Sequence, residues 1–430
     1  MDDRVQISFK VLGVFLCLYI FLVGISGLSK SISGLTAPEH LAAGDMAQLK
    51  KITLEEENTT KKKVWVKIIS VEDDGRYGFE YKETKDSLPI KGYTIKKNIK
   101  KVASANFISA TNSAFICLFI GVFATVLFQS SSTTTSLIVG MAGGGLITLT
   151  SAIPMVMGAN IGTTVTNTLI SIGHIRRGEE FKRAFAASTV HDFFNIMAVF
   201  IFLPLELAFG ILEKSATFLG GVFFTEISEK PFKSPIKKAV SWGVDHLKDF
   251  VHSISYSDWL LLFVSVVVTL IMLFSIVRLL KSMVLSKVEA FFDKYIFTTA
   301  IRAMTFGFFL TILVQSSSIT TSVIVPLAGA GVLSLRQIFP FTLGANIGTT
   351  ITSIMAALVL NPIAMVVAFS HLLFNILGIL LIYPFKVTRE IPLKCAEKIA
   401  ELSIKNKFIP ILYLAIVFVL IPLTMILLGG

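Results

Sequence analysis

One long segment occurs twice in this chain, and the duplication constrains the fold more than any other feature of the sequence. Residues 129–167 read QSSSTTTSLIVGMAGGGLITLTSAIPMVMGANIGTTVTN, and residues 315–353 read QSSSITTSVIVPLAGAGVLSLRQIFPFTLGANIGTTITS. The offset is 315 minus 129, or 186 residues, throughout, and about half of the aligned positions are identical. Shared apolar composition alone does not produce this agreement, so the two segments form an internal repeat.

A weaker echo follows each copy. Residues 191–195 read HDFFN and residues 371–375 read HLLFN, now at an offset of 371 minus 191, or 180 residues. Because the offset changes, the loops between the motifs differ in length while the flanking helices correspond.

The composition is that of a membrane protein. Hydrophobic residues make up 53% of the chain and charged residues only 16%, with a mean hydropathy of +0.76. Soluble proteins carry about 25% charged residues, and several apolar runs here reach the roughly 20 residues that a membrane-spanning helix needs. We therefore expect a multi-pass integral protein of the plasma (cell) membrane, surrounded by lipid.

The formal net charge of +11 does not indicate nucleic acid as a partner. Lysines and arginines gather in the loops beside apolar runs, as the positive-inside rule expects. The three cysteines, Cys17, Cys117 and Cys395, are too far apart to suggest a disulfide framework or a metal site. Nothing in the sequence indicates an oligomeric state.

The sequence predicts six segments. They are a first, retained transmembrane helix at 1–33, a polar, β-rich and extracytoplasmic module at 34–101, the first repeat at 102–210, a connector at 211–259, the second repeat at 260–385, and a basic cytoplasmic segment with a last transmembrane helix at 386–430. Within the module, VWVKIISV and RYGFEYKE flank Asp73-Asp74-Gly75, a pattern typical of a β-hairpin.

Each repeat predicts a helical hairpin and a broken helix. The apolar run that precedes Gln129 stops at eight consecutive polar residues, and a similar polar run, interrupted only by Ile319, begins at Gln315. A hairpin that dips into the bilayer, with the polar run at its tip, explains this pattern better than a full span. The GANIGTT motifs at 158–164 and 344–350 predict interruptions in the helix that follows, lining a buried site.

Counting the crossings from a cytoplasmic N-terminus places the first hairpin on the outer side and the second on the inner side. The predicted fold class is thus an all-α polytopic membrane protein with two inverted-topology repeats, each with a re-entrant helical hairpin and a broken helix, and a small inserted β-rich module. This arrangement occurs in many secondary transporters, whose substrates bind near the midplane.

The repeated segments offer only neutral oxygen ligands. No Asp or Glu occurs from Ser87 to Gly178 or from Lys294 to Arg389. Proton coupling commonly uses carboxylates or histidines inside the membrane, and the candidates His191, Asp192 and His371 lie outside the repeated core. Amide, hydroxyl and carbonyl oxygens suit sodium. The N-termini of interrupted helices and two serine triplets suit a small oxyanion.

Together these motifs resemble one known family. QSSS followed by GANIGTT, both duplicated, and FKRAFAASTVHDFFN after the first copy resemble the type II sodium-dependent phosphate cotransporters, from about Phe107 to Tyr383. The resemblance implies a symporter that imports inorganic phosphate with sodium by alternating access. Sodium ions would be co-transported ligands, no bound cofactor is implied, and the chain would not be an enzyme.

The resemblance also implies the binding residues. The phosphate ligands would be the serine triplets and motif asparagines, with a basic residue before HDFFN: Ser130, Ser131, Ser132, Ser316, Ser317, Ser318, Asn160, Asn346 and Arg183. The sodium ligands would be the glutamine, serine and threonine oxygens of the two copies: Gln315, Ser316, Thr349, Thr352, Gln129, Ser130, Thr163 and Thr166. Because 129–167 contains no carboxylate, the extra sodium site of some family members lacks its acidic ligand.

Several alternatives stay open at the level of sequence. A sodium-coupled carrier of sulfate or arsenate would use the same neutral donors. An anion channel would need a continuous polar path, and a phosphate sensor would have only the module at 34–101 as its distinguishing feature. A serine hydrolase is disfavoured because no G-x-S-x-G motif occurs.

Overall fold

The computed structural model describes residues 3–35, 46–54, 59–71, 76–81, 90–95, 99–103, 113–225, 235–291 and 296–429. Six of its helices are long and apolar enough to cross a membrane: Ser8–Ile32, Glu179–Phe209, Asp258–Leu279, Leu335–Leu358, Pro362–Ile382 and Ile409–Leu428. Large apolar side chains on the outside of the bundle, such as those of Phe200, Phe263 and Leu427, are more than 60% exposed. Such a surface suits lipid, and the chain is a multi-pass integral membrane protein.

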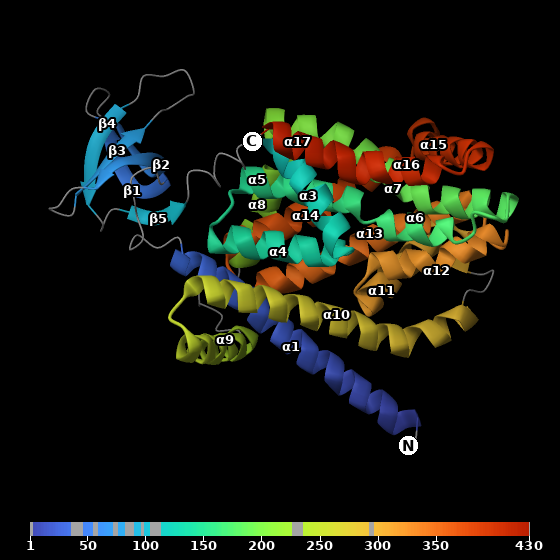
Figure 1. Ribbon diagram of the computed structural model, residues 1–430, viewed down its shortest axis with the longest axis horizontal. Helices are drawn as coiled ribbons and strands as arrows, with labels where there is room; N and C mark the ends of the chain where they lie inside the picture. Colours follow the sequence, from blue (N-terminus) through green and yellow to red (C-terminus); the bar gives the residue numbers. More distant parts are fainter. Residues whose placement is uncertain are drawn as a thin grey trace.

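The helical bundle contains most of the described chain (Figure 1). In chain order its first helices are α1 (Asp3–Leu35), α3 (Ala114–Phe128), α4 (Ser131–Gly144), α5 (Leu149–Gly162), α6 (Val165–Ile172), α7 (Glu179–Phe209), α8 (Ile211–Thr225) and α9 (Pro235–Ile254). They are followed by α10 (Asp258–Phe291), the 3₁₀ turn η3 (Ile296–Thr298), α11 (Ala300–Val314), α12 (Ser317–Gly329), α13 (Leu335–Leu358), α14 (Pro362–Ile382), α15 (Lys386–Lys405), α16 (Ile409–Ala415), η4 (Ile416–Leu420) and α17 (Ile421–Gly429).

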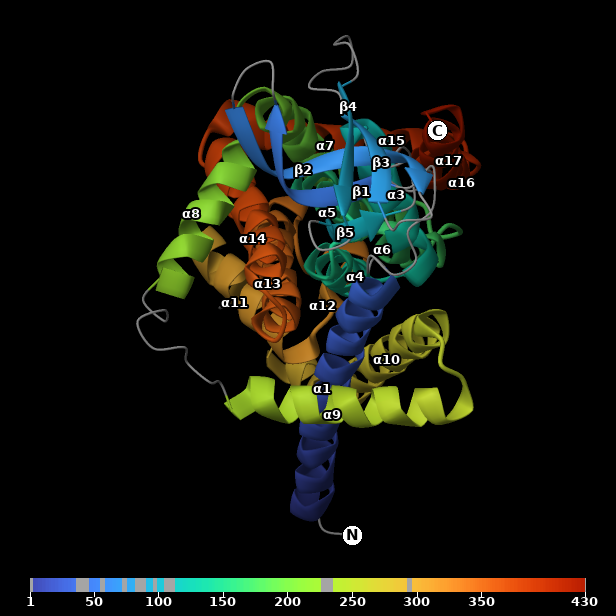
Figure 2. The same ribbon diagram turned by 90° about the vertical axis from the view of Figure 1, so that its left-hand side faces the viewer.

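A five-stranded antiparallel sheet stands at one end of the bundle (Figures 1 and 2). Its strands are β1 (Met46–Leu54), β2 (Thr59–Val71), β3 (Arg76–Tyr81), β4 (Ile90–Ile95) and β5 (Ile99–Ala103), in the order β4-β3-β2-β1-β5. Val66, Ile68 and Phe79 are buried, as the alternating pattern of half-buried strands requires. Strands β2 and β3 pair where the sequence predicts a hairpin; its turn at 73–75 lies outside the described residues.

The two helical hairpins lie at opposite ends of the bundle. Helices α3 and α4 lie near the sheet, whereas α11 and α12 lie toward the other end (Figure 1). Figure 1 shows α4 and α12 nearly in line, α4 toward the sheet and α12 toward the other end. Ser131 and Ser317, the first residues of α4 and α12, are buried, whereas Gln129 is exposed.

The helix after each hairpin is interrupted in the first copy only. In the first copy α5 ends at Gly162, and α6 begins at Val165 after two turn residues. In the second copy α13 continues from Leu335 to Leu358, so the predicted interruption at 344–350 is wrong. The same GANIGTT motif therefore does not by itself break a helix.

The glycines of this motif instead permit close helix packing. A Cβ atom at Gly158 would overlap the carbonyl oxygen of Leu118 on α3, and one at Gly344 would overlap that of Met304 on α11. The next glycines, Gly162 and Gly348, likewise face Thr125 and Thr311. This small-x-x-x-small spacing lets two backbones approach each other in a membrane protein, and both copies use it, whether the helix is interrupted or continuous.

The polar connector also contains helices. Helix α8 packs against α14, and α9 packs against α1. Trp242 and Phe250 of α9 are more than 60% exposed, while Val240, Val244 and Val251 are buried. The connector at 211–259 is therefore structured where described, at the same end of the bundle as the sheet (Figure 1).

Candidate functional site

Each hairpin turns at a glutamine with a left-handed backbone. Gln129 has φ 52° and Gln315 has φ 56°, and they are the only described residues other than glycine with positive φ. Both side chains donate from Nε2 to a carbonyl three residues earlier, Val126 at 2.5 Å and Ile312 at 2.6 Å. Non-glycine residues rarely adopt this conformation, and strained backbone of this kind clusters at functional sites.

The glutamine amide oxygens contact the GANIGTT helices. Thr166 donates its hydroxyl to Oε1 of Gln129 at 3.0 Å, and Thr352 donates to Oε1 of Gln315 at 2.8 Å. The structure thus brings two pairs of predicted sodium ligands together, in the same way in both copies.

The serine after each glutamine begins the second helix of its hairpin. Ser130 accepts a hydrogen bond from the amide of Thr133, and Ser316 accepts one from the amide of Ile319. A serine at this position is a strong helix N-cap. Each tip therefore joins the C-terminal end of one helix, which attracts cations, to the N-terminal end of the next, which attracts anions.

The other predicted serines lie in the first turns of α4 and α12. Ser131, Ser132, Ser317 and Ser318 are at most 5% exposed. Within the described residues, only the Ser318 hydroxyl among these four donates a hydrogen bond, to the Thr163 carbonyl at 3.1 Å. First-turn amides and hydroxyls at a buried helix N-terminus are suitable donors to an oxyanion.

The predicted threonine ligands keep their lone pairs available. Thr163 donates to the Ala159 carbonyl at 3.0 Å, and Thr349 donates to the Ala345 carbonyl at 3.1 Å. A hydroxyl whose proton points to a carbonyl of its own helix still has acceptor capacity. Both threonines are buried, so these oxygens can serve a desolvated cation.

The motif asparagines cross-link the two copies. Asn160 of α5 donates to Asn375 on α14 at 3.0 Å and accepts from His371 at 3.0 Å. Asn346 of α13 donates to Asn195 on α7 at 2.8 Å and accepts from His191 at 2.6 Å. Each copy's asparagine therefore binds the H-x-x-x-N pair of the other copy.

A second set of contacts joins α6 to α12. Asn167 donates to the Thr321 hydroxyl at 2.6 Å and accepts from Ser322 at 3.1 Å. Together with the Ser318–Thr163 bond, these contacts satisfy backbone and side-chain groups at the interruption between α5 and α6. Polar side chains between membrane helices commonly bond across them in this way.

Comparison with known proteins identifies the group to which this architecture belongs. The profile of the Na+/Pi-cotransporter family matches residues 92–225 and 270–386, more than half of the chain. The chain belongs to the Na+/Pi-cotransporter family. This is the family that the duplicated motifs resemble.

Vertebrate members of the family align over most of this chain. It is 33% identical to the human sodium-dependent phosphate transport protein 2B over 407 residues, which cover 74% of this chain and 59% of that protein. It is 34% identical to the rat sodium-dependent phosphate transport protein 2A over 378 residues, covering 71% and 59%. The chain spans about three fifths of the length of these relatives. No solved structure matches it.

The structure separates Arg183 from the other predicted ligands. Its Nε donates to the Gly329 carbonyl at 2.9 Å, at the end of α12 opposite to Ser316. Thirteen residues of helix correspond to about 20 Å. Arg183 therefore does not join the serine tips in this structure.

Some residues of the buried network were not predicted from the sequence as site residues. Asn167, Thr321 and Ser322 lie inside the repeated segments, and their polar side chains in a largely apolar chain were an available signal; Asn167 and Thr321 are buried. Among the described residues, no group of three or more His, Cys, Asp or Glu is placed to hold a metal ion. Neutral oxygens are thus the main ligands that the tips offer.

Proposed function

We propose that this member of the Na+/Pi-cotransporter family imports inorganic phosphate together with sodium. The names of the relatives, sodium-dependent phosphate transport proteins, support this assignment. The observation that carries it is the paired tip, where a left-handed glutamine places its amide oxygen against a threonine of the next helix in both copies. This arrangement concentrates neutral oxygens at two equivalent points, exposed at Gln129 and half-buried at Gln315.

Sodium would bind beside Gln315, with its pseudo-symmetric counterpart at Gln129. Oε1 of Gln315, the hydroxyls of Thr349 and Thr352, and the oxygens of Ser316 are its candidate ligands. Gln315 caps the C-terminus of α11, where unpaired carbonyls carry partial negative charge. Carbonyl groups at the ends of interrupted membrane helices bind sodium in other transporters.

Phosphate would bind between the first turns of α4 and α12. These turns face the middle of the bundle from opposite directions (Figures 1 and 2), and each contributes hydroxyl donors from a serine triplet. Sodium at the adjacent helix ends would offset the charge of the anion. Asn160 and Asn346, which are engaged in cross-links, would position the tips instead of contacting phosphate directly.

The two repeats would be inverted in the membrane and would work by alternating access. One end of the bundle bears the sheet and the connector, and the other bears the α6–α7 loop and α15 (Figure 1). The second end carries Arg176, Arg177, Lys386 and Arg389, so the positive-inside rule favours placing it in the cytoplasm. The re-entrant hairpins would then approach the midplane from opposite sides.

Uptake of labelled phosphate into proteoliposomes tests this function. We expect accumulation when sodium outside exceeds sodium inside, and little when potassium replaces the sodium gradient. Competition with sulfate and arsenate would show the anion selectivity. Equal phosphate uptake with and without the gradient would refute the coupling.

The sodium site has its own test. Gln315→Ala and Ser316→Ala should each raise the sodium concentration for half-maximal uptake by about tenfold. The reason is that losing a ligand that contributes roughly 1.4 kcal/mol to the free energy of sodium binding weakens binding by that factor. Gln315→Asn is the matched control for the backbone, since asparagine tolerates the left-handed conformation but reaches less far. A sodium activation curve unchanged in all three variants would remove these residues from the site.

A further inference from the structure

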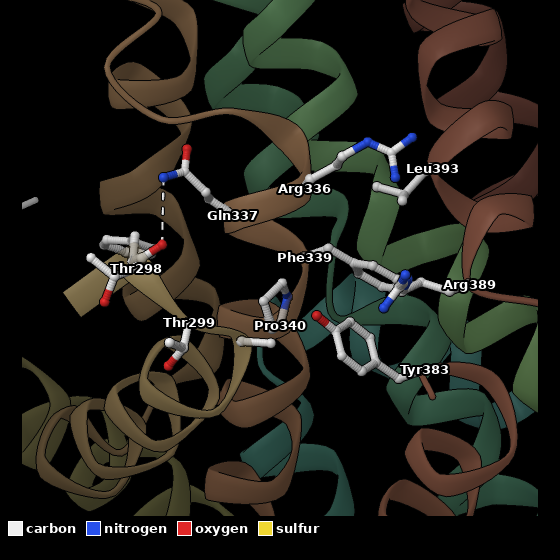
Figure 3. A pocket seen from close by; sticks show the side chains of 11 residues that line it. Thr298, Thr299, Arg336, Gln337, Phe339, Pro340, Tyr383, Arg389 and Leu393 are labelled. Atoms are coloured by element: carbon white, nitrogen blue, oxygen red, sulfur yellow. Dashed lines mark hydrogen bonds between the residues drawn. The ribbon is translucent and has the colours of Figure 1, made fainter. Parts of the chain in front are cut away.

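A cavity of about 260 Å³ opens far from the serine tips, where α11, α13 and α15 begin (Figure 3). It is lined by Phe297, Thr298, Thr299, Ala300, Arg336, Gln337, Phe339, Pro340, Tyr383, Arg389 and Leu393. Arg336 and Thr349 both lie on α13, thirteen residues apart, which corresponds to about 20 Å. The cavity is therefore separate from the proposed transport site.

The lining of this cavity is positively charged. It contains two arginines and no acid. Arg336 forms a bidentate ion pair with Glu390, whose carboxylate balances its charge. Arg389 is half-buried and, within the described residues, has no ion-pair partner; its guanidinium lies 5.4 Å from the centre of the Tyr383 ring. Arg389 thus brings an unbalanced charge to the cavity wall.

Two helix N-termini add to this charge. Ala300 is the first residue of α11, and Arg336 and Gln337 lie in the first turn of α13. Thr299 and Ser334 cap one first-turn amide of each helix, those of Arg302 and Gln337. The other amides of a first helical turn have no partner within the helix, and the helix dipole there attracts anions. The close-up shows Arg389 and the Tyr383 hydroxyl on the same side of the cavity (Figure 3).

The repeat fold does not require these residues. At the repeat offsets of 186 and 180, the first-copy counterparts of Arg336 and Tyr383 are Thr150 and Leu203, and Arg389 lies on α15, beyond the second repeat. The helical packing is therefore built in the first copy without a cation or a phenol at these positions. The charged cavity therefore lies beside the second copy and is separate from the tips that both copies have.

We propose that this cavity is a second oxyanion site, which binds a phosphate group through Arg389, the Tyr383 hydroxyl and the first turns of α11 and α13. A guanidinium beside helix N-termini is well suited to phosphate oxygens. The phosphate group comes either from inorganic phosphate in solution or from the headgroup of an anionic lipid. The volume exceeds the roughly 30 Å³ of a water molecule severalfold, so it accommodates either source.

Binding to the purified full-length protein without sodium tests the proposal independently of transport. The variants are Arg389→Gln and Tyr383→Phe, and Lys386→Gln is the control because it removes the same charge from the same helix outside the cavity. The probes are labelled inorganic phosphate and nanodiscs with or without phosphatidic acid. We expect Arg389→Gln to weaken binding of one probe about tenfold, as loss of a charged hydrogen bond of roughly 1.4 kcal/mol would, with a smaller loss for Tyr383→Phe.

The pattern of losses identifies the ligand. Loss of inorganic phosphate binding alone indicates an ion from solution, and loss of phosphatidic acid binding alone indicates a lipid headgroup. Arg389→Lys should recover part of the binding, and an unchanged melting temperature shows that the variants are folded. Wild-type binding of both probes by Arg389→Gln, or an equal loss in Lys386→Gln, would overturn the proposal.

Discussion

The two copies of the repeated segment have the same tips but differ in the helix that follows. Gln129 and Gln315 share their backbone conformation and their contacts with threonine, although 186 residues separate them. The GANIGTT helix, in contrast, is interrupted between α5 and α6 and continuous in α13. The local sequence thus determines the tip, whereas tertiary contacts determine whether the helix breaks.

The largest effects are expected where the copies are most alike, at the motif glycines. Gly158→Ala and Gly344→Ala would each force a Cβ against a backbone carbonyl of the packed helix. Overpacking of this kind lowers the free energy of unfolding by about 1–3 kcal/mol. Thermal melting of the purified protein in detergent measures the loss.

Gly221→Ala is the control for the glycines, because an added methyl group there meets no atom within 4 Å. It should melt like the wild type. A loss confined to one of the two motif variants would show that the copies are packed differently, against the similarity that the structure indicates.

The asparagine cross-links should give the next largest effect. Asn346→Ala leaves Asn195 and His191 without this partner, and Asn160→Ala does the same to Asn375 and His371. An unsatisfied buried polar group costs about 1–3 kcal/mol.

Double variants separate a cross-link from two independent losses. Asn346→Ala with Asn195→Ala should destabilise by less than the sum of the single variants, because the second substitution removes an amide oxygen that has already lost this hydrogen bond. The pair Asn160 and Asn375 should behave alike. Strict additivity in either pair would contradict a direct bond between the copies.

A smaller loss of stability should distinguish the two copies near the interruption between α5 and α6. Ser318→Ala removes the hydroxyl that donates to the Thr163 carbonyl, and we expect a loss of about 1 kcal/mol. Ser132 is its first-copy counterpart and, in the described part of the chain, makes no equivalent bond, so Ser132→Ala should cost less. Melting in phosphate-free buffer compares the two; equal losses would mean that this bond does not distinguish the copies.

The sequence predicts the tips well because their chemistry is local. A polar run that stops an apolar helix, followed by a serine, contains both the turn and the N-cap of the next helix. The sequence could not predict that α13 is continuous, since the spacing of Gly344 and Gly348 fits either a break or close packing. The same close packing occurs in both copies, so contacts elsewhere in the fold decide whether the helix breaks.

The cross-links were also beyond the reach of sequence pattern. HDFFN and HLLFN indicated corresponding helices, but not that Asn160 would bond to the second motif and Asn346 to the first. That exchange depends on how the copies interlock in space. Arg183 is the opposite case, because its place in a motif suggests a ligand, whereas in this structure it bonds to the Gly329 carbonyl at the far end of α12.

The smallest expected effect belongs to the ion pair found in the second copy alone. Arg336 and Glu390 bond at the rim of the charged cavity, where the first copy has Thr150. The guanidinium hydrogen bond lowers the pKa of Glu390 below its ordinary value of 4.5. A carboxyl whose pKa is lower in the folded state stabilises the protein above the unfolded pKa, and this contribution is lost as the pH falls through the folded pKa.

Glu390→Gln should therefore reduce the melting temperature slightly at pH 7 and leave it unchanged at a pH below the folded pKa. Because Arg336 is exposed, salt screens its ion pair with Glu390. The difference in melting temperature between the wild type and Glu390→Gln at pH 7 should therefore be smaller at 1 M salt, where the Debye length is about 3 Å. Melting curves of both proteins across pH and salt measure this. If the two proteins differ in melting temperature by the same amount at low pH, the effect comes from packing of the Glu390 side chain and not from its charge. The second copy would then differ from the first at this rim in shape and not in charge.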